Sequence, residues 1–236
     1  MQDIAIIIPS RLDSVRLPKK PLAKIGDLTM IERVSMAALK TGISAVYIAT
    51  DSTEIGALAE KIGAKAIITD KECASGTDRV FLASQIANLP HKVIVNVQGD
   101  MPFVDPDVIL QVAKMCLDTD FDITTAVSEA NPEYAASVSN VKAIVDKNGR
   151  ALYFSRAMIP HNAQTYLCHI GIYAFKRDAL SKFCSLPTSE IEKSESLEQL
   201  RALHNGMSIG ACRAASMPIS VDTADDLAAA IAVLQQ

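Results

Sequence analysis

The feature that most constrains the fold is the alternation of short β-branched runs with helix-length amphipathic segments in the first half of the chain. The expected strands cover residues 4–8, 45–50, 65–68 and 92–97. The expected helices cover residues 30–39, 54–62, 78–87 and 105–117. Because this order is typical of repeated strand–helix–strand units, we expect an α/β fold with a mostly parallel, doubly wound sheet.

The pattern changes after about residue 120. Residues 140–146 and 151–155 flank a Lys147-Asn148-Gly149 turn, which predicts an antiparallel hairpin. A further strand is expected at 168–175, a return to the main sheet at 218–221 and a closing helix at 223–234. We therefore expect a single domain over residues 1–236 that contains an inserted region at about 131–207.

Composition excludes several classes of protein. The net charge of −4 over 236 residues argues against a nucleic-acid surface, so a small-molecule substrate is the better expectation. The apolar stretch near the N-terminus is too short to span a membrane and has no basic leader, which favours a cytoplasmic protein. The scattered cysteines lack metal or redox spacing and are expected to be reduced core thiols: Cys73, Cys116, Cys168, Cys184 and Cys212.

A basic loop follows the first expected strand. Residues 9–22 carry Arg11, Arg16, Lys19 and Lys20 at the position where open α/β sheets bind ligands. These side chains could surround a triphosphate by forked hydrogen bonds and point charge, although the loop lacks the glycine pattern of a Walker motif. A solvated basic loop is the alternative.

Two acids follow expected strands farther along the chain. Asp100 ends a buried run and could hold magnesium, because carboxylates are its usual ligands, or it could cap the helix that begins near Pro106. Asp222 precedes the last helix, where capping is by itself the more common role. Only a pairing with Asp100 makes Asp222 a candidate second ligand.

Other segments give weaker signals. Residues 75–79 join a strand to a helix with hydroxyls and a glycine, and could contact a ligand. His169 lies in an expected strand, where a histidine is more often a core or interface residue than a catalyst. Residues 195–203 form a helical run whose polar side chains could simply be solvated.

Several motifs in order resemble the 3-deoxy-manno-octulosonate (Kdo) cytidylyltransferase family, nearly end to end. They are IIPSR at 7–11, RLPKKPL at 16–22, SGTDR at 75–79, NVQGD at 96–100, ALYFSR at 151–156, HIGIY at 169–173, LEQLR at 197–201 and VDT at 221–223. The resemblance implies a Rossmann-like nucleotidyltransferase core with an inserted antiparallel region for sugar binding and dimerisation. It also implies CMP transfer from CTP to Kdo for lipopolysaccharide biosynthesis, by a magnesium-dependent homodimer in the cytoplasm.

The resemblance also implies roles for individual residues. Asp100 and Asp222 would bind Mg²⁺, and Lys20, Arg11 and Asp100 would act in catalysis. The expected CTP contacts are Ser10, Arg11, Lys20, Ser75, Gly76, Thr77, Arg79 and Gln98. The expected contacts to the sugar acid are Arg156, His169, Tyr173, Glu198 and Gln199.

Three departures from the family pattern leave alternatives open. Lys19 stands at a usual glycine, Met101 stands at a usual acid or amide, and residues 161–164 replace basic and aromatic residues in a short loop before Tyr166. That loop helps to enclose the sugar acid. The alternatives are therefore a cytidylyltransferase for another ulosonic acid, 8-amino-Kdo or a sialic-acid-like sugar, and a nucleotide-binding dimer with reduced catalysis.

Overall fold

A computed structural model describes residues 1–14, 16–70 and 72–234. The chain forms two compact units: Met1–Leu110 with Pro218–Gln236, and Gln111–Met217. The region expected at about 131–207 lies within the second unit. The chain passes from the first unit to the second within helix α4 (Pro106–Asp118).

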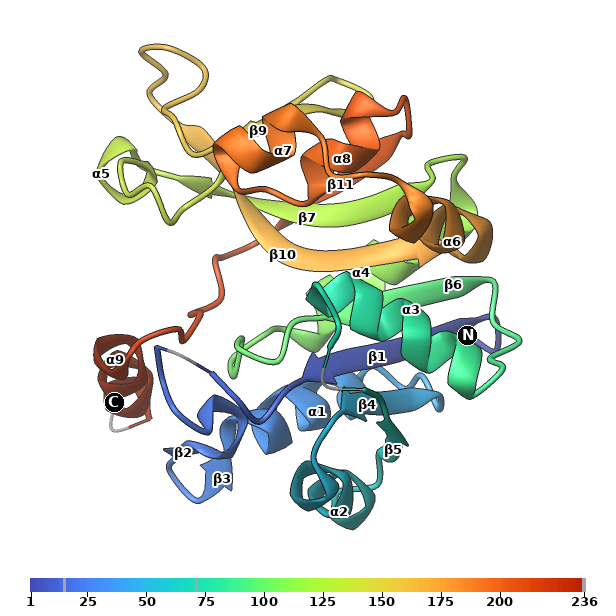
Figure 1. Cartoon of the computed structure of the whole chain (residues 1–236). Coiled ribbons are helices and arrows are strands. Elements are labelled where there is room, and N and C mark those ends of the chain that lie inside the picture. Colours follow the sequence, from blue (N-terminus) through green and yellow to red (C-terminus); the bar gives the residue numbers. More distant parts are fainter. Residues whose placement is uncertain (15, 71, 235–236) are drawn as a thin grey trace. The chain divides into compact units, whose positions relative to one another are not determined.

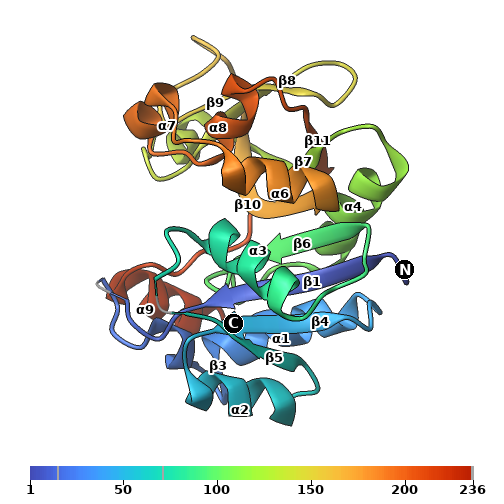
Figure 2. The same cartoon turned by 45° about the vertical axis from the view of Figure 1, so that its right-hand side comes forward.

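The first unit contains a four-stranded parallel sheet in the order β6-β1-β4-β5. These strands are β1 (Ile4–Ser10), β4 (Val46–Thr50), β5 (Lys65–Ile68) and β6 (Val93–Val97). Helix α3 (Gly76–Ile86) lies on one face and α1 (Met30–Lys40) on the opposite face, while α2 (Thr53–Lys61) lies beside β5 (Figures 1 and 2). The predicted α/β fold with a mostly parallel sheet is confirmed.

The sequence explains why these elements form. All five residues from Ile4 to Ile8 are at most 1% exposed, as expected for a strand covered on both faces. Helix α1 begins with a capping box between Thr29 and Glu32, and Ser75 caps α3. Since β1, β4 and β6 run parallel, the loops that follow them meet at one edge of the sheet.

The C-terminal segment returns to the first unit without forming the strand predicted at 218–221. Pro218 cannot donate a backbone hydrogen bond, and Val221 N–H donates to the Asp100 carbonyl (2.9 Å) beyond the end of β6. Val221 then packs with Ile25, Met30 and Ala230. These residues belong to β2 (Lys24–Ile25), α1 and α9 (Ala224–Val233), and the last matches the predicted closing helix.

The second unit has β7 (Ile123–Ala130) between β11 (Ile209–Ala214), which is parallel to it, and β10 (Tyr166–Lys176), which is antiparallel. β8 (Lys142–Val145) and β9 (Ala151–Ser155) form the predicted hairpin, and β8 also pairs with β10. β7 and β11 were not predicted, because Thr, Ser and Glu in β7 and Gly and Arg in β11 weaken the apolar signal of a strand.

Short elements complete both units. They are η1 (Lys20–Leu22) and β3 (Leu28–Thr29) in the first unit, and α5 (Pro132–Ala135), α6 (Arg177–Ser185), α7 (Glu190–Glu195) and α8 (Gln199–His204) in the second. None of the helices in the described part of the chain is long and apolar enough to cross a membrane.

The cysteine prediction is correct in part. All five cysteines are free thiols, but only Cys116 and Cys168 are buried, whereas Cys73, Cys184 and Cys212 are partly exposed. Burial raises the pKa of the Cys116 thiol to about 11, so this side chain stays protonated and behaves as a small apolar group.

Candidate active site

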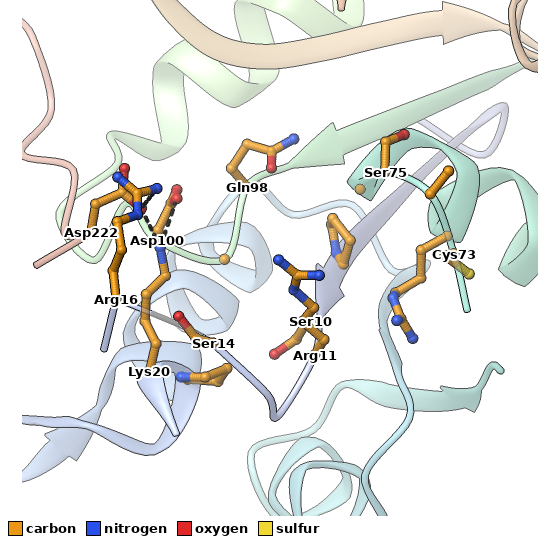
Figure 3. A pocket seen from close by; sticks show the side chains of 16 residues that line it. Ser10, Arg11, Ser14, Arg16, Lys20, Cys73, Ser75, Gln98, Asp100 and Asp222 are labelled. Atoms are coloured by element: carbon orange, nitrogen blue, oxygen red, sulfur yellow. Dashed lines mark hydrogen bonds and ion pairs between the residues drawn. The ribbon is translucent and has the colours of Figure 1, made fainter. Parts of the chain in front are cut away.

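A cavity of about 350 Å³ lies in the first unit at the carboxyl ends of β1 and β6. Its walls come from the loop after β1, the start of α3, the segment after β6 and Asp222 (Figure 3). Its charged lining residues are Arg11, Arg16, Lys20, Arg79, Asp100 and Asp222. The four cations outnumber the two carboxylates, so the cavity suits a polyanion.

The two carboxylates converge on Lys20 at one end of the cavity (Figure 3). Lys20 Nζ lies 3.0 Å from Asp100 Oδ2 and 2.8 Å from Asp222 Oδ1, and Arg16 Nη2 lies 3.2 Å from the same Asp222 oxygen. The side chains of Lys20, Asp100 and Asp222 are 17%, 26% and 39% exposed, so they remain accessible to a ligand. Asp100 and Asp222 therefore share one cation, the Lys20 ammonium.

Neither carboxylate is used as a helix cap. Helix α9 is capped by Thr223, whose side chain accepts from Asp226 N–H, while Asp226 Oδ2 accepts from the backbone N–H of Thr223 and Asp222. The capping interpretation of Asp222 is therefore wrong, because Thr223 and Asp226 perform that role. Likewise, the Asp100 carboxylate bonds Lys20, 80 residues away in sequence.

Close backbone packing brings Asp100 to this place. A Cβ on Gly99 would lie 3.1 Å from the carbonyl oxygen of Pro9, so glycine allows the end of β6 to approach the end of β1. The hydrogen bond from Val221 N–H to the Asp100 carbonyl then aligns the C-terminal segment with β6. This bond places Asp222 beside Asp100, although the two are far apart in sequence.

The carboxylate pair fits the predicted magnesium ion. Mg²⁺ is usually bound by one or two carboxylates, with its other ligands supplied by water and substrate phosphates. The described residues contain no group of three or more His, Cys, Asp or Glu side chains that could hold a metal by themselves. The Lys20 ammonium between Asp100 and Asp222 further shows that their oxygens are oriented toward a common cation.

The opposite end of the cavity contains the N-terminus of α3 (Figure 3). Ser75 caps this helix by accepting from Asp78 N–H (3.1 Å), and Gly76 leaves the backbone accessible. The buried Ser10 hydroxyl has no hydrogen-bond partner among the described residues, so it can bond a ligand. Desolvation raises the pKa of the nearby Cys73 thiol, which argues against a thiolate nucleophile.

Seven of the eight predicted CTP contacts line this cavity: Ser10, Arg11, Lys20, Ser75, Gly76, Arg79 and Gln98. Thr77 does not, since it is 1% exposed and its hydroxyl accepts from Asn96 Nδ2 (3.3 Å). Asn96 Oδ1 in turn accepts from Gln98 Nε2 (3.1 Å). Sequence reasoning missed Asn96, although a polar residue within the apolar strand β6 was an available signal.

Three of the residues predicted to contact the sugar acid, His169, Tyr173 and Glu198, lie together in the second unit. The rings of His169 and Tyr173 are 5.3 Å apart, and the His169 ring also packs against Phe154 at 5.1 Å. Burial lowers the pKa of His169 to about 3, so its imidazole is neutral near pH 7. Burial and the Glu198 carboxylate raise the pKa of Tyr173, which keeps its hydroxyl protonated as a donor.

Gln199 and Arg156 differ in their available hydrogen-bonding capacity. Gln199 is 5% exposed, and its Nε2 has no partner among the described residues, so this amide can donate a hydrogen bond to a ligand. The Arg156 guanidinium instead donates to the carbonyls of Val138, Glu195 and Ser196 at 2.9, 2.8 and 3.2 Å. These bonds connect Arg156 to the segment just before Glu198.

Lys19 and Met101 differ in their surroundings. Lys19 has a φ of 53°, a left-handed conformation that glycine adopts more readily, and nothing in the structure explains a lysine there. Met101 is 4% exposed and belongs to the core. Residues 161–165 form a short, mostly exposed segment before β10.

Comparisons with known proteins agree with this geometry. A family model described as cytidylyltransferase matches residues 5–209. The 3-deoxy-manno-octulosonate cytidylyltransferases of Rickettsia massiliae (strain Mtu5) and Rickettsia felis (strain ATCC VR-1525 / URRWXCal2) are 47% and 48% identical to this chain over 232 residues. In both cases the match covers 98% of this chain and 94% of the relative.

Solved structures show the same relationship. A CMP:2-keto-3-deoxy-manno-octonic acid synthetase complexed with CTP superposes with a TM-score of 0.91 at 36% identity, covering 99% of this chain and 98% of that one. A cytidylyltransferase from Leptospira borgpetersenii serovar Hardjo-bovis (strain JB197) shares the fold at a TM-score of 0.64 and 15% identity, with 99% and 94% covered. The chain belongs to the cytidylyltransferase family.

Proposed function

We propose that this protein transfers CMP from CTP to the anomeric hydroxyl of Kdo and releases pyrophosphate. The observation that carries the proposal is the convergence of Lys20, Asp100 and Asp222 in a cavity that also contains Arg11 and Arg16. The named activity of relatives at 47–48% identity supports Kdo as the acceptor.

The cavity residues suit a nucleoside triphosphate. The guanidinium groups of Arg11 and Arg16 can donate two parallel hydrogen bonds to phosphate oxygens, and Lys20 supplies a compact positive charge. The N-terminus of α3, at Ser75 and Gly76, adds backbone N–H groups and the positive end of a helix dipole. These groups bind CTP and hold its α-phosphorus for attack.

The chemistry requires positioning and charge neutralisation. The hydroxyl oxygen of Kdo gives up its proton to solvent and forms a bond to the α-phosphorus. The bond from this phosphorus to the bridging oxygen breaks, and pyrophosphate leaves with the electron pair. Lys20 and Arg11 stabilise the charge that develops on the leaving group. Asp100 and Asp222 would hold Mg²⁺, which when bound supplies Lewis-acid polarisation of phosphate oxygens.

The second unit supplies the groups for the sugar acid. Tyr173 and Gln199 offer hydrogen-bond donors, while Glu198 offers an acceptor, which suits a molecule with several hydroxyls and one carboxylate. Neutral His169 bonds the Thr125 hydroxyl through Nε2 (2.8 Å), which leaves Nδ1 for the sugar acid without adding charge. Arg156 supports this group through its bonds to the Glu195 and Ser196 carbonyls.

The same proposal includes Mg²⁺ as cofactor, a homodimer, a cytoplasmic location and a role in lipopolysaccharide biosynthesis. The location follows from the proposed requirement for CTP, and the donor set of Asp100 and Asp222 supports the metal. The dimer is testable at Val138 and Leu152 of the second unit, whose side chains are apolar and 70% and 53% exposed. Charged substitutions there would shift the mass measured by light scattering if either residue lies in the interface.

Substrate specificity tests the proposal. Pyrophosphate release is measured with CTP, UTP or ATP as donor and with Kdo, 8-amino-Kdo or a sialic acid as acceptor, beside controls that lack one component. The proposal predicts the highest kcat/KM for CTP with Kdo. A clear preference for another ulosonic acid would replace the acceptor, and CTP binding without release for any acceptor would indicate the nucleotide-binding dimer.

A further inference from the structure

Asp51 is a buried acid beside the cavity and has no part in the proposed mechanism. It follows β4 directly, and its side chain is 6% exposed. It does not cap α2, because the Ser52 hydroxyl accepts from Ile55 N–H and performs that role. Since burying a carboxylate costs free energy unless its neighbours compensate, the partners of Asp51 indicate its role.

Those partners belong to two different walls of the cavity. Asp51 Oδ1 accepts from Leu12 N–H at 3.2 Å, and Asp51 Oδ2 lies 3.6 Å from Arg79 Nη2. Leu12 follows Arg11 in the loop after β1, whereas Arg79 lies in the first turn of α3. One carboxylate therefore connects the loop that carries the phosphate-binding cations to the helix N-terminus opposite.

Arg79 depends on this acid for electrostatic reasons. A cation in the first turn of a helix is opposed by the positive end of the helix dipole, and Arg79 is only 3% exposed. Its Nη1 donates to Thr69 Oγ1 at 2.6 Å, and Asp51 supplies the negative charge next to Nη2. The three residues come from the ends of β4 and β5 and the start of α3.

We infer that Asp51 is a positioning residue for nucleotide binding. It acts through Leu12 N–H and the Arg79 guanidinium, and so fixes the position of the loop after β1 relative to the N-terminus of α3. It acts on CTP only through these two neighbours and does not itself line the cavity. The inference rests on the proposed function, because it takes CTP to be the ligand of this cavity.

The test compares two substitutions that remove different parts of the interaction. In Asp51→Asn, the amide oxygen can still accept from Leu12 N–H, but the charge beside Arg79 is lost. Asp51→Leu removes both the hydrogen bond from Leu12 N–H and the charge beside Arg79. CTP affinity is measured by calorimetry, and KM is measured for CTP and for Kdo. We expect the Kd for CTP to rise about tenfold in the Asn variant, because Asp51 acts on CTP only through its neighbours, and to rise more in the Leu variant, with KM for Kdo unchanged.

Glu192→Gln provides a matched control in the second unit. Glu192 is also a buried acid paired with an arginine, since its Oε1 lies 2.6 Å from Arg201 Nη2. This variant should lower Tm as Asp51→Asn does, because both break a buried ion pair, but it should leave the Kd for CTP within twofold of the wild type.

A double-mutant cycle with Arg79→Met separates positioning from general destabilisation. If Asp51 acts through Arg79, Asp51→Asn should weaken CTP binding much less in the Arg79→Met background. Full additivity, or a Kd for Asp51→Asn equal to that of the wild type despite a lower Tm, would overturn the inference. Wild-type protein that fails to bind CTP would instead contradict the proposed function.

Discussion

Replacing Lys20 with methionine should have opposite effects on metal binding and on turnover. Lys20 Nζ lies 3.0 Å from Asp100 and 2.8 Å from Asp222, on the same oxygens that a metal would use. A metal ion must therefore compete with the Lys20 ammonium for these carboxylates. Methionine keeps much of the side-chain volume and removes the charge, so it removes the competitor.

The magnitude follows from the geometry. Two unit charges about 3 Å apart interact by roughly 5 kcal/mol at an effective dielectric constant of about 20, and by roughly 1.4 kcal/mol in water. The side chains are 17%, 26% and 39% exposed, so screening and the cost of desolvation reduce the net competition to about 1–2 kcal/mol. Since 1.4 kcal/mol is a factor of ten, Lys20→Met should bind a divalent ion roughly 5–30-fold more tightly in the absence of nucleotide.

Turnover should change in the other direction. Loss of one positive charge aimed at a leaving group typically costs about 3 kcal/mol of transition-state stabilisation, so kcat should fall by roughly 10²-fold. Metal binding is measured with Mn²⁺ by electron paramagnetic resonance, and kcat by pyrophosphate release. Lys92→Met is the matched control, because Lys92 forms an exposed ion pair with Asp3 at 3.3 Å and should affect neither quantity.

Unchanged or weaker Mn²⁺ binding in Lys20→Met would refute the electrostatic reasoning. It would mean that Asp100 and Asp222 do not hold the metal, or that Lys20 does not compete for their oxygens. An unchanged kcat would separately remove Lys20 from the stabilisation of the leaving group.

Further predictions concern the remaining site residues. Asp222→Asn should lower kcat by about 10²-fold with little change in Tm, because Thr223 and Asp226 retain the helix cap; near-normal turnover would exclude Asp222 as a metal ligand. His169 binds no proton in the folded state between its unfolded pKa of 6.5 and its folded pKa of about 3, so folding stability should fall as pH drops through this range. Urea unfolding should show that His169→Gln loses less folding stability than the wild type as pH drops. Equal pH profiles of stability would contradict the assignment of this loss to His169. Gln199→Met should raise Tm, because it removes a buried donor without a partner among the described residues, yet raise KM for Kdo and leave KM for CTP unchanged.

Much of the first unit could be predicted from sequence, because its strands are continuous apolar runs. The strand at 65–68 was predicted with its observed bounds, and α1 to within one residue. The second unit was harder. Buried Thr124 and Thr125 obscure β7, even though their hydroxyls donate to backbone carbonyls of Val112 and Ile172. Local sequence shows polarity but does not show that these bonds exist.

The site shows the same division. Arg11, Lys20 and Asp100 could be found because they follow strands of a parallel sheet, whose carboxyl ends share one edge. Asp222 was ambiguous, since an acid before a helix usually caps it, and only its spatial pairing with Asp100 gives it another role. Asp51 gave no signal, because its significance depends on Leu12 and Arg79, which are distant in sequence.

The most direct test of the central claim is product analysis of the purified protein with CTP, Mg²⁺ and Kdo. The account predicts one CMP–Kdo, identified by mass, for each pyrophosphate released, and neither product when CTP, Kdo or Mg²⁺ is omitted. CTP binding without formation of CMP–Kdo, or pyrophosphate release that does not require Kdo, would contradict it.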